Sequence, residues 1–387
     1  MDNGPAMIQI HRANISDPDM VKDFVRAGSH VAMHTPQWIP RLEMEMRDHL
    51  SSKNPYFKTA KCTLIVAYDV RHTPNPIGRI SVQTPHNASQ TFASPSIAHF
   101  GFPAATDRET FHRLLAAAED IARQAGCRYI AGPYSLSMND EVGLLVEGYD
   151  SSPRLLMNYA PPWMKTTLED HHYQGIKDLL AYEIGASQDL PPAAVKMTDS
   201  ASTSARISCR SIDLRNLHRD LGIVRNIFNR AWAKNWGFIP MSNADIHYMA
   251  QSMKMILDPD LAHIAFVDDK PAAMIVALPD INEAIRDFDG KLLPLNWIKL
   301  IWRLKIKGIS SARVVLMGVE PDFQSGVFGS ALSLMLISKI HHAIRDKKME
   351  TVELSWILED NTAIKRMIES VGGKESKRYR LFEKDLV

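Results

Sequence analysis

The pattern that most constrains the fold lies in residues 313–387, where strand, turn, helix, strand and helix follow in one order. Residues 314–319 are a short apolar, largely β-branched run that predicts a strand, and residues 320–322 end it. A glycine-containing segment, 324–330, then opens an apolar stretch that predicts a helix to about Ile344. A strand that leads through such a turn into a helix presents free backbone N–H groups at the positive end of a dipole. The sequence therefore predicts an anion-binding cradle here.

The strand predicted at residues 351–356 carries two polar residues on one face. Strand alternation places Glu353 and Ser355 together, opposite three apolar side chains. A helix-start signature follows at residues 359–362, that helix ends at Gly372 and Gly373, and residues 379–384 predict a closing strand. Glu353 on this strand is either a charge at the exposed rim or a general base.

This order resembles the GNAT superfamily of acyl-CoA-dependent N-acyltransferases. In that family a Gln/Arg-x-x-Gly-x-Gly/Ala turn wraps the pyrophosphate of coenzyme A. Gln324 and Gly329 match the turn, but Val327 stands where the intervening glycine is expected, with Gly326 displaced by one. Because a β-branched residue resists positive φ, the loop must differ or bind more weakly. The resemblance implies a cofactor-binding set of Val319, Gln324, Ser325, Gly326, Val327, Gly329, Ser330 and Asn361.

The resemblance also implies direct acyl transfer to an amine. A backbone N–H near Val319 would polarise the thioester carbonyl. A protonated amine is not a nucleophile, so Glu353 or Glu320 would take its proton. The tyrosine that often protonates the leaving thiolate in this family falls on Ile368, which leaves Tyr379 as the nearest candidate by sequence. Asn361 matches a family position, and it is also an ordinary helix N-cap residue.

Charge and cysteine content exclude several classes of function. The chain of 387 residues has 45 basic and 44 acidic residues, so its charge predicts no nucleic-acid partner. Its three cysteines, Cys62, Cys127 and Cys209, have no metal or redox spacing, and we expect no bound metal. No 18-residue apolar run exists. We therefore expect a cytoplasmic protein.

The strand–strand–strand–helix–strand order occurs twice, which predicts an α/β (α+β) fold of tandem GNAT-like halves, each a mixed, splayed sheet flanked by helices. We expect an N-terminal half at 1–185, a linker at 186–204 and a C-terminal half at 205–387 with an insertion at 285–310. Residues 103–107 hold no glycine between strand and helix. The first half is therefore expected to lack a cradle.

Two other segments could contact a substrate. The polar stretch after residue 131 brings Ser137, Asn139 and Glu141 near one another, although such residues also simply build turns. Trp236 and Phe238 lie in a short loop and could line an apolar tunnel or anchor that loop to the core.

Residues 291–307 depart from small GNAT domains. The segment is apolar, contains two tryptophans and carries only positive charge. This composition suits peripheral contact with the inner membrane face, and equally suits a buried helix whose lysines reach solvent. The whole chain resembles the large two-half bacterial GNAT-like proteins, a group in which some members acylate sphingoid bases to ceramides. The resemblance implies acyl-CoA as co-substrate, not a permanently bound cofactor, and an amine acceptor that could be a lipid.

Three alternatives stay open at this point. A tandem GNAT fold also resembles aminoacyl-tRNA-dependent transferases, although the near-zero net charge speaks against a tRNA-binding surface. A small-molecule N-acetyltransferase would explain the cradle but not the insertion. A non-catalytic acyl-CoA-binding scaffold would explain both Val327 and the missing tyrosine.

Overall fold

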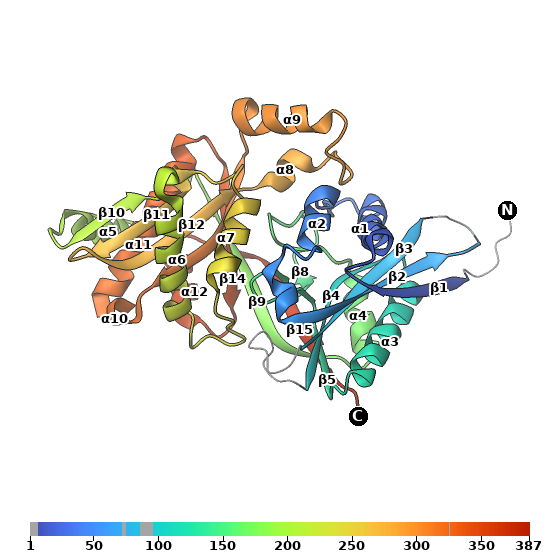
Figure 1. The fold of residues 1–387 in the computed structure, drawn as a ribbon. Helices are drawn as coiled ribbons and strands as arrows, with labels where there is room; N and C mark the ends of the chain where they lie inside the picture. The colour runs from blue at the N-terminus through green and yellow to red at the C-terminus, as the bar shows by residue number, and fades with distance from the viewer. Residues whose placement is uncertain (1–6, 72–74, 86–95, 325) are drawn as a thin grey trace. The chain divides into compact units, whose positions relative to one another are not determined.

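Residues from both halves of the sequence contribute to each of the two units that make up the fold (Figure 1). The computed structural model describes residues 7–71, 75–85, 96–324 and 326–387. Unit 1 holds Met1–Asp178, Ile285–Lys299 and Lys377–Val387, and unit 2 holds Leu179–Ala284 and Leu300–Ser376.

Unit 1 is built on a mixed sheet in which neighbouring strands follow the order β1-β2-β3-β4-β5-β15. Neighbouring strands of this sheet pair antiparallel, except β4 and β5, which are parallel. Their pairing begins with Ile97 opposite Tyr129 and ends with His99 opposite Ala131, and β4 continues beyond it. The strands of this sheet and the three short strands beside it are β1 (Ile8–Asn14), β2 (Ala60–Asp69), β3 (Pro76–Pro85), β4 (Ile97–Ala105), β5 (Tyr129–Gly132), β6 (Tyr134–Ser135), β7 (Glu141–Val142), β8 (Leu144–Glu147) and β15 (Lys374–Asp385).

Helices cover both faces of the unit 1 sheet. On one face Phe24 of α1 packs in a core with Leu64 of β2 and Leu50, which follows α2. On the other face a side chain at Gly78 of β3 would meet Thr110 and Leu114 of α3, so this face packs against α3. The helices are α1 (Pro18–Met33), α2 (Glu43–His49), the 3₁₀ helix η1 (Pro55–Lys58), α3 (Arg108–Gln124) and α4 (Pro162–Asp170).

Unit 2 repeats the plan with the strand order β9-β14-β13-β12-β11-β10. Its parallel pair is β13 and β14, registered from Ser311/Thr351 to Val314/Leu354, after which β13 runs on to Val319. The strands are β9 (Gln174–Gly185), β10 (Ile207–Ser211), β11 (Ala262–Val267), β12 (Lys270–Pro279), β13 (Ser311–Val319) and β14 (Thr351–Leu358). A parallel pair that stops short of the strand ends is the splay predicted from the sequence.

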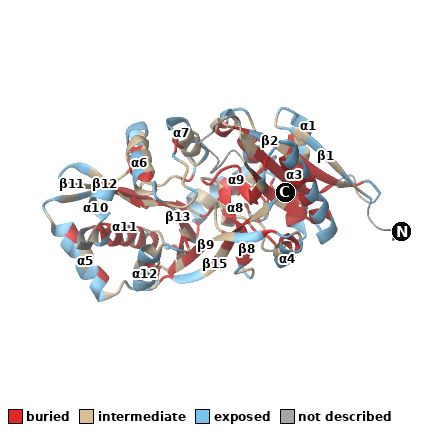
Figure 2. Cartoon of the chain, turned by 90° about the horizontal axis from the view of Figure 1, so that it is seen from below, coloured by how far each residue is buried: buried red, intermediate tan, exposed pale blue. Residues whose placement is uncertain are grey.

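Two cores flank the unit 2 sheet. One contains Val314 of β13 and Leu354 of β14 with the apolar side of α11, and the other contains Leu316 of β13 with α6 and α7. Figure 2 shows buried residues concentrated in the strands and exposed residues on helices such as α5. The helices are α5 (Pro192–Thr203), η2 (Leu214–Asn216), α6 (Leu217–Ala231), α7 (Asn243–Ser252), η3 (Pro259–Leu261), α8 (Ile281–Ile285), α10 (Pro321–Gln324), α11 (Gly326–Asp346) and α12 (Thr362–Ser370). The mixed α/β architecture predicted from the sequence is confirmed.

The last strand of each half of the sequence completes the sheet of the other half. Leu179–Gly185 of β9 pair antiparallel with β14 in unit 2. Phe382–Asp385 of β15 pair antiparallel with β5 in unit 1. The stretch 186–204, for which the sequence suggested a linker, contains helix α5, and its Ala194 and Ala201 lie in the same core as α11.

The inserted stretch forms α9 (Asn296–Trp302) and a following π-helical turn (Arg303–Lys307). Seven of its large apolar side chains are exposed: Leu293, Leu295, Trp297, Ile298, Ile301, Trp302 and Ile306. Leu300, in contrast, is buried, so α9 has one apolar side turned to the protein and another turned to solvent. Of the helices in the described residues, none combines the length and the hydropathy needed to cross a bilayer.

Candidate active site

The predicted cradle lies where β13 passes through α10 into α11. The Gln324 amide donates to the carbonyl of Val319 at 2.8 Å, which ties the turn to the end of the strand. A Cβ at Gly329 would stand 2.5 Å from the carbonyl oxygen of Gln324 and 2.7 Å from that of Phe323. Only glycine allows this close approach. The turn is thus tight, and the first N–H groups of α11 have no partner within the helix. Such an N-terminus suits a phosphate.

Val327 lies inside α11, so its position requires no positive φ. The departure from the glycine pattern is therefore compatible with a cradle made by a helix start instead of a glycine loop. Gly326 is the first residue of α11, and Ser330 is exposed on its first turn. Ser325 lies outside the described residues.

The corresponding helix start in unit 1 is occupied by an acid. Asp107 caps α3, and its carboxylate accepts from the backbone N–H of Thr110 at 2.8 Å. A carboxylate at that place satisfies the helix dipole and repels a second anion. The geometry therefore favours a phosphate cradle in unit 2 over one in unit 1.

A β-bulge in β13 places two consecutive apolar side chains toward α6 and α7. The register with β12 pairs Val276 with Leu316 but Ala277 with Val314, so Val315 is the extra residue. Val315 and Leu316 both pack with the α6/α7 core. The indole N–H of Trp232, at the end of α6, donates to the carbonyl of Met317 at 3.0 Å and fixes this helix to the strand. Bulges of this kind often redirect groups beside active sites.

Glu353 is buried in a charged network on this same face of the sheet. It accepts from the hydroxyl of Ser355 at 2.5 Å, and that hydroxyl accepts from Arg313 Nε at 2.7 Å. Arg313 Nε also stands 3.8 Å from the Glu353 carboxylate, and its Nη2 donates to the Ser355 carbonyl at 3.1 Å. The exposed fractions of the Arg313 and Glu353 side chains are 5% and 2%. Glu353 is therefore an enclosed carboxylate with a counter-ion, not a rim charge.

Sequence reasoning missed two residues of this network. Arg313 lies beside Glu353 in the parallel register of β13 and β14, and Glu183 of β9 lies directly opposite Glu353. A charged residue at an inward position of an apolar strand was a usable signal for Arg313. No local signal identifies Glu183, because it reaches unit 2 from the first half of the sequence.

Glu320, the second predicted base, lies at the end of β13. Its carboxylate is 2.8 Å from Arg230 Nε, and Arg230 also pairs with Asp322. Burial, with a contribution from Asp322, raises the pKa of Glu320 despite the opposing guanidinium of Arg230. A carboxylate with a raised pKa is a stronger base once ionised.

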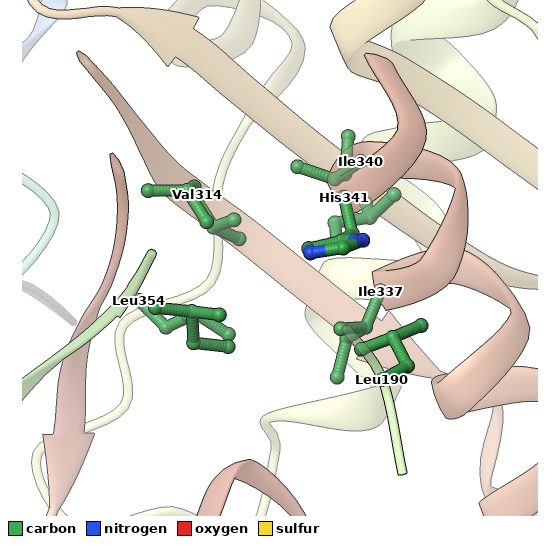
Figure 3. A pocket seen from close by; sticks show the side chains of 9 residues that line it. Leu190, Val314, Ile337, Ile340, His341 and Leu354 are labelled. Atoms are coloured by element: carbon green, nitrogen blue, oxygen red, sulfur yellow. The ribbon is translucent and has the colours of Figure 1, made fainter. Parts of the chain in front are cut away.

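Pockets lie on both faces of the unit 2 sheet. Figure 3 shows the one on the α11 face, of about 290 Å³, with Val314 and Leu354 facing Ile337 and Ile340. His341 is its polar member, and its Nε2 lies 2.8 Å from the carbonyl of Gln188. Burial lowers the pKa of His341, so the imidazole is neutral near pH 7.

The pocket on the α6/α7 face is larger, about 530 Å³, and lies over the bulge. Apart from Asp220, its lining is entirely apolar: Ile212, Leu217, Leu221, Val224, Ile246, Met249, Ala250, Met253, Leu257, Val276, Leu278, Val315 and Leu316. The guanidinium of Arg210 donates two hydrogen bonds, of 2.6 and 2.7 Å, to the carboxylate of Asp220. Leu278 is the register partner of Arg313, so the pocket borders the charged network.

The remaining predicted residues of the C-terminal half have structural contacts. Asn361 caps α12, and its side chain accepts from the N–H of Ile364 at 3.3 Å. Phe238 packs 5.7 Å from Phe228 in the α6/α7 core. Trp236 is half-buried in the loop after α6. Tyr379 is fully buried in unit 1, where a side chain at Gly143 would meet it, whereas the predicted cradle belongs to unit 2.

Ser137, Asn139 and Glu141 are brought together in the turn between β6 and β7. The Ser137 hydroxyl donates to Asp140 at 2.9 Å and accepts from the N–H of Asn139 at 3.1 Å. Glu141 stands 3.4 Å from Arg41. These bonds build the turn and place the partly exposed Asp140 at its centre, a residue that the sequence did not single out.

The comparisons with known proteins agree with this architecture. The chain is 36% identical to the protein YghO of Escherichia coli (strain K12) over 95% of its own length and 93% of that protein. It is likewise 36% identical to the bacterial ceramide synthase of Caulobacter vibrioides (strain NA1000 / CB15N), over 96% of both chains. The chain belongs to the bacterial ceramide synthase family. No protein-family model matches the chain.

Two solved structures share this fold. A tandem GNAT protein from the clavulanic acid biosynthesis pathway superimposes with a TM-score of 0.58 at 13% identity, over 98% of this chain and 99% of its own. A GCN5-related N-acetyltransferase from Sphaerobacter thermophilus gives 0.51 at 14% identity, over 99% and 96%. The chain therefore has a GNAT fold and belongs to a family of N-acyltransferases. In its described residues, no cluster of three or more His, Cys, Asp or Glu side chains could hold a metal ion.

We predict that stability falls as the pH drops below about 6.5, because two histidines are buried neutral in unit 1. Burial lowers the pKa of His49 and His99 to about 3, with Arg41 adding to the effect on His49. The unfolded chain therefore binds protons that the folded chain does not. Each histidine should change the free energy of unfolding by up to about 1.4 kcal/mol per pH unit.

Urea unfolding at pH values of about 7.5 and about 5.5 measures this free energy of unfolding. The variants His49→Gln and His99→Gln should each flatten the dependence, and an unchanged slope in both would contradict this account.

Proposed function

We propose that the protein transfers a long-chain acyl group from acyl-CoA to the primary amine of a lipid such as a sphingoid base, giving a ceramide-like amide. The observation that carries this proposal is the apolar pocket beside the Arg313–Glu353 network. Its lining offers no free polar group, and such a surface suits a hydrocarbon chain. The name of the Caulobacter relative points the same way.

In this proposal the donor is held by the end of β13 and the start of α11. The pyrophosphate lies at the N-terminus of α11, beside Gln324 and Gly329, with Ser325, Gly326, Val327 and Ser330 at the same turn. The backbone N–H near Val319 polarises the thioester carbonyl, which stabilises the oxyanion of the tetrahedral intermediate. The acyl chain enters the apolar pocket along Leu316 and Val315. Asn361 shapes the same end of the sheet as the cap of α12.

The amine must lose a proton before it attacks. Glu353 is the proposed base, because its carboxylate is 2% exposed and lies 3.8 Å from Arg313 Nε. The hydroxyl of Ser355 lies between Arg313 and Glu353 and donates to the carboxylate. Glu320 is the alternative base at the same end of β13. The thiolate of coenzyme A leaves as the amide forms, and Tyr379 stays only a candidate for its protonation.

The acceptor would come from a membrane that the insertion touches. The exposed apolar residues of 291–307 include Trp297 and Trp302, which are 45% and 49% exposed. Between them lies Lys299, and the segment contains no acidic residue. Tryptophan with lysine is the composition that binds the interface of an anionic bilayer. Ser137, Asn139, Glu141, Trp236 and Phe238 stay proposed contacts of the acceptor.

Thiol release with matched donors and acceptors tests the proposed function. We expect release from palmitoyl-CoA with sphinganine, and little from acetyl-CoA or with small polar amines, because a long chain covers more of the apolar lining. Ala250→Phe should narrow the pocket and shift the preference toward shorter acyl groups, while Ala233→Phe, at an exposed position outside the lining, should not. Release with acetyl-CoA and polar amines alone would favour a small-molecule acetyltransferase. No release with any pair would favour a binding scaffold.

Glu353→Gln should lower kcat by about a hundredfold or more if the carboxylate is the base. The substitution keeps the size of the side chain but leaves the buried Arg313 guanidinium without its carboxylate, so the melting temperature should fall and kcat is measured on protein that circular dichroism shows to be folded. The loss should shrink as the pH rises, because more of the amine is then already deprotonated. Glu320→Gln is the matched comparison. Full activity of Glu353→Gln at pH 7 would remove Glu353 as base, and a loss that does not depend on pH would assign it a structural role.

Trp297→Ala combined with Trp302→Ala should weaken binding to phosphatidylglycerol vesicles by about tenfold or more, because both exposed rings would enter the interface. Vesicle sedimentation measures the binding. Met255→Ser removes a 63% exposed apolar side chain elsewhere and should leave binding unchanged. Equal binding of the tryptophan variant and the wild type would exclude this segment as the membrane contact.

A further inference from the structure

Unit 1 buries a row of polar side chains on the sheet face that packs against α1. Arg79, Ser81 and Gln83 alternate along β3 and are 9%, 0% and 0% exposed. Their register partners on β2, such as Leu64, belong to the apolar core with α1. A buried polar row of this kind is costly unless its groups are satisfied, which makes a ligand role worth testing.

Three groups with unused hydrogen-bonding capacity lie at one end of this row. His49 ends α2, Tyr56 lies in η1, and Asp140 lies in the turn between β6 and β7. His49 Nε2 stands 3.6 Å from Asp140 Oδ1. Tyr56 is close enough that Asp140 is among the charges that raise its pKa, after burial itself. In the part of the chain that the structure describes, His49 Nε2 and the Tyr56 hydroxyl have no hydrogen-bond partner, and both residues are 8% exposed.

Within the turn, hydrogen bonds reach only one of the two carboxylate oxygens of Asp140. The N–H and the hydroxyl of Ser137 both donate to Oδ2, at 3.2 and 2.9 Å. Oδ1 is the oxygen that faces His49. The Asp140 side chain is 27% exposed, so a ligand can reach it. A residue needed only for the turn would not require a histidine and a tyrosine around its second oxygen.

The local charges favour a cation. Three carboxylates, those of Glu45, Glu141 and Asp140, lie near two guanidinium groups, those of Arg41 and the buried Arg79. Burial raises the pKa of Asp140 to about 6, with Glu141 adding to the effect against the bonds from Ser137. Burial lowers the pKa of His49 to about 3, so the imidazole adds no positive charge. An ammonium group at Oδ1 would compensate the excess negative charge.

We propose that Asp140, His49 and Tyr56 form a binding site in unit 1 for the head of a protonated amino alcohol. The carboxylate accepts from the ammonium group, and the imidazole and the phenol bond to the hydroxyls. The ring of Phe102, 6.3 Å from that of His49, forms an apolar wall. The identity of the ligand rests on the proposed function, because a sphingoid base carries such a head. As a binding site it stands on the contacts described above.

Binding of sphinganine in detergent micelles, followed by calorimetry with the full chain, tests the site. Asp140→Asn and Tyr56→Phe should each raise the Kd for sphinganine, by about tenfold or more for the charge-bearing residue. Neither should change the Kd for palmitoyl-CoA. Asp120→Asn is the control, because it removes an exposed carboxylate from the same unit. Tyr56→Phe removes only an unpaired hydroxyl, so its melting temperature should equal or exceed that of the wild type.

The outcomes separate the site from the enzyme activity. Sphinganine binding unchanged in both variants overturns the site, whatever the enzyme does. Binding lost in the variants, from a wild-type protein that transfers no acyl group, supports the site and overturns the proposed function. Active wild-type protein whose variants show an unchanged KM for sphinganine overturns the site and leaves the proposed function standing.

Discussion

Strand pairing at the splayed edge is the constraint on which the rest of the structure depends. In each unit the parallel pair is short, so the second strand of the pair needs a partner on its other side. A lone β14 or β5 would expose unpaired N–H and C=O groups. Leu179–Gly185 of β9 supply that partner in unit 2, and Phe382–Asp385 of β15 supply it in unit 1. Neither half of the sequence can therefore complete its sheet from its own residues.

This exchange also determines which residues can meet. Glu183 comes to lie opposite Glu353 because β9 completes the sheet of unit 2. In unit 1, Arg380 of β15 holds Asp178 with bonds of 2.6 and 2.8 Å, and Asp178 is 5% exposed. A buried carboxylate of this kind needs its guanidinium partner, since a lone charge there would cost several kcal/mol. This ion pair holds β15 in unit 1 through side chains, in addition to the backbone hydrogen bonds between β15 and β5.

The order of elements in residues 313–387 could be predicted from the sequence because it depends on local signals. Alternation, the proline after Glu320 and the glycines at 372 and 373 mark β13, α11, β14 and α12. The turn at Gln324 and Gly329 could be predicted for the same reason. The stretch 186–204 read as a linker because it is polar, yet tertiary packing of two alanines against the α11 core makes most of it a helix. The intrinsic helix propensity of these residues takes no account of such a tertiary contact, so the helix could not be predicted from it.

Long-range contacts limited the prediction of the site. Arg313 and Ser355 are 42 residues apart, and only the parallel register of β13 and β14 brings them together. The position of Asp140 beside His49 likewise depends on how α2 and the β6–β7 turn pack. The sequence could not distinguish Glu353 from an exposed acidic residue as a candidate base. Its 2% exposure and its guanidinium partner Arg313 make that distinction.

The two units share a plan and differ in the chemistry of one sheet face. Each has a bulge in its central strand, at Phe102 of β4 in unit 1 and at Val315 of β13 in unit 2. Beside the bulge, unit 1 buries polar groups, and unit 2 presents an aliphatic pocket bordered by Arg313. Because the two units share their order of strands, the side chains at these strand positions carry the difference between the two linings.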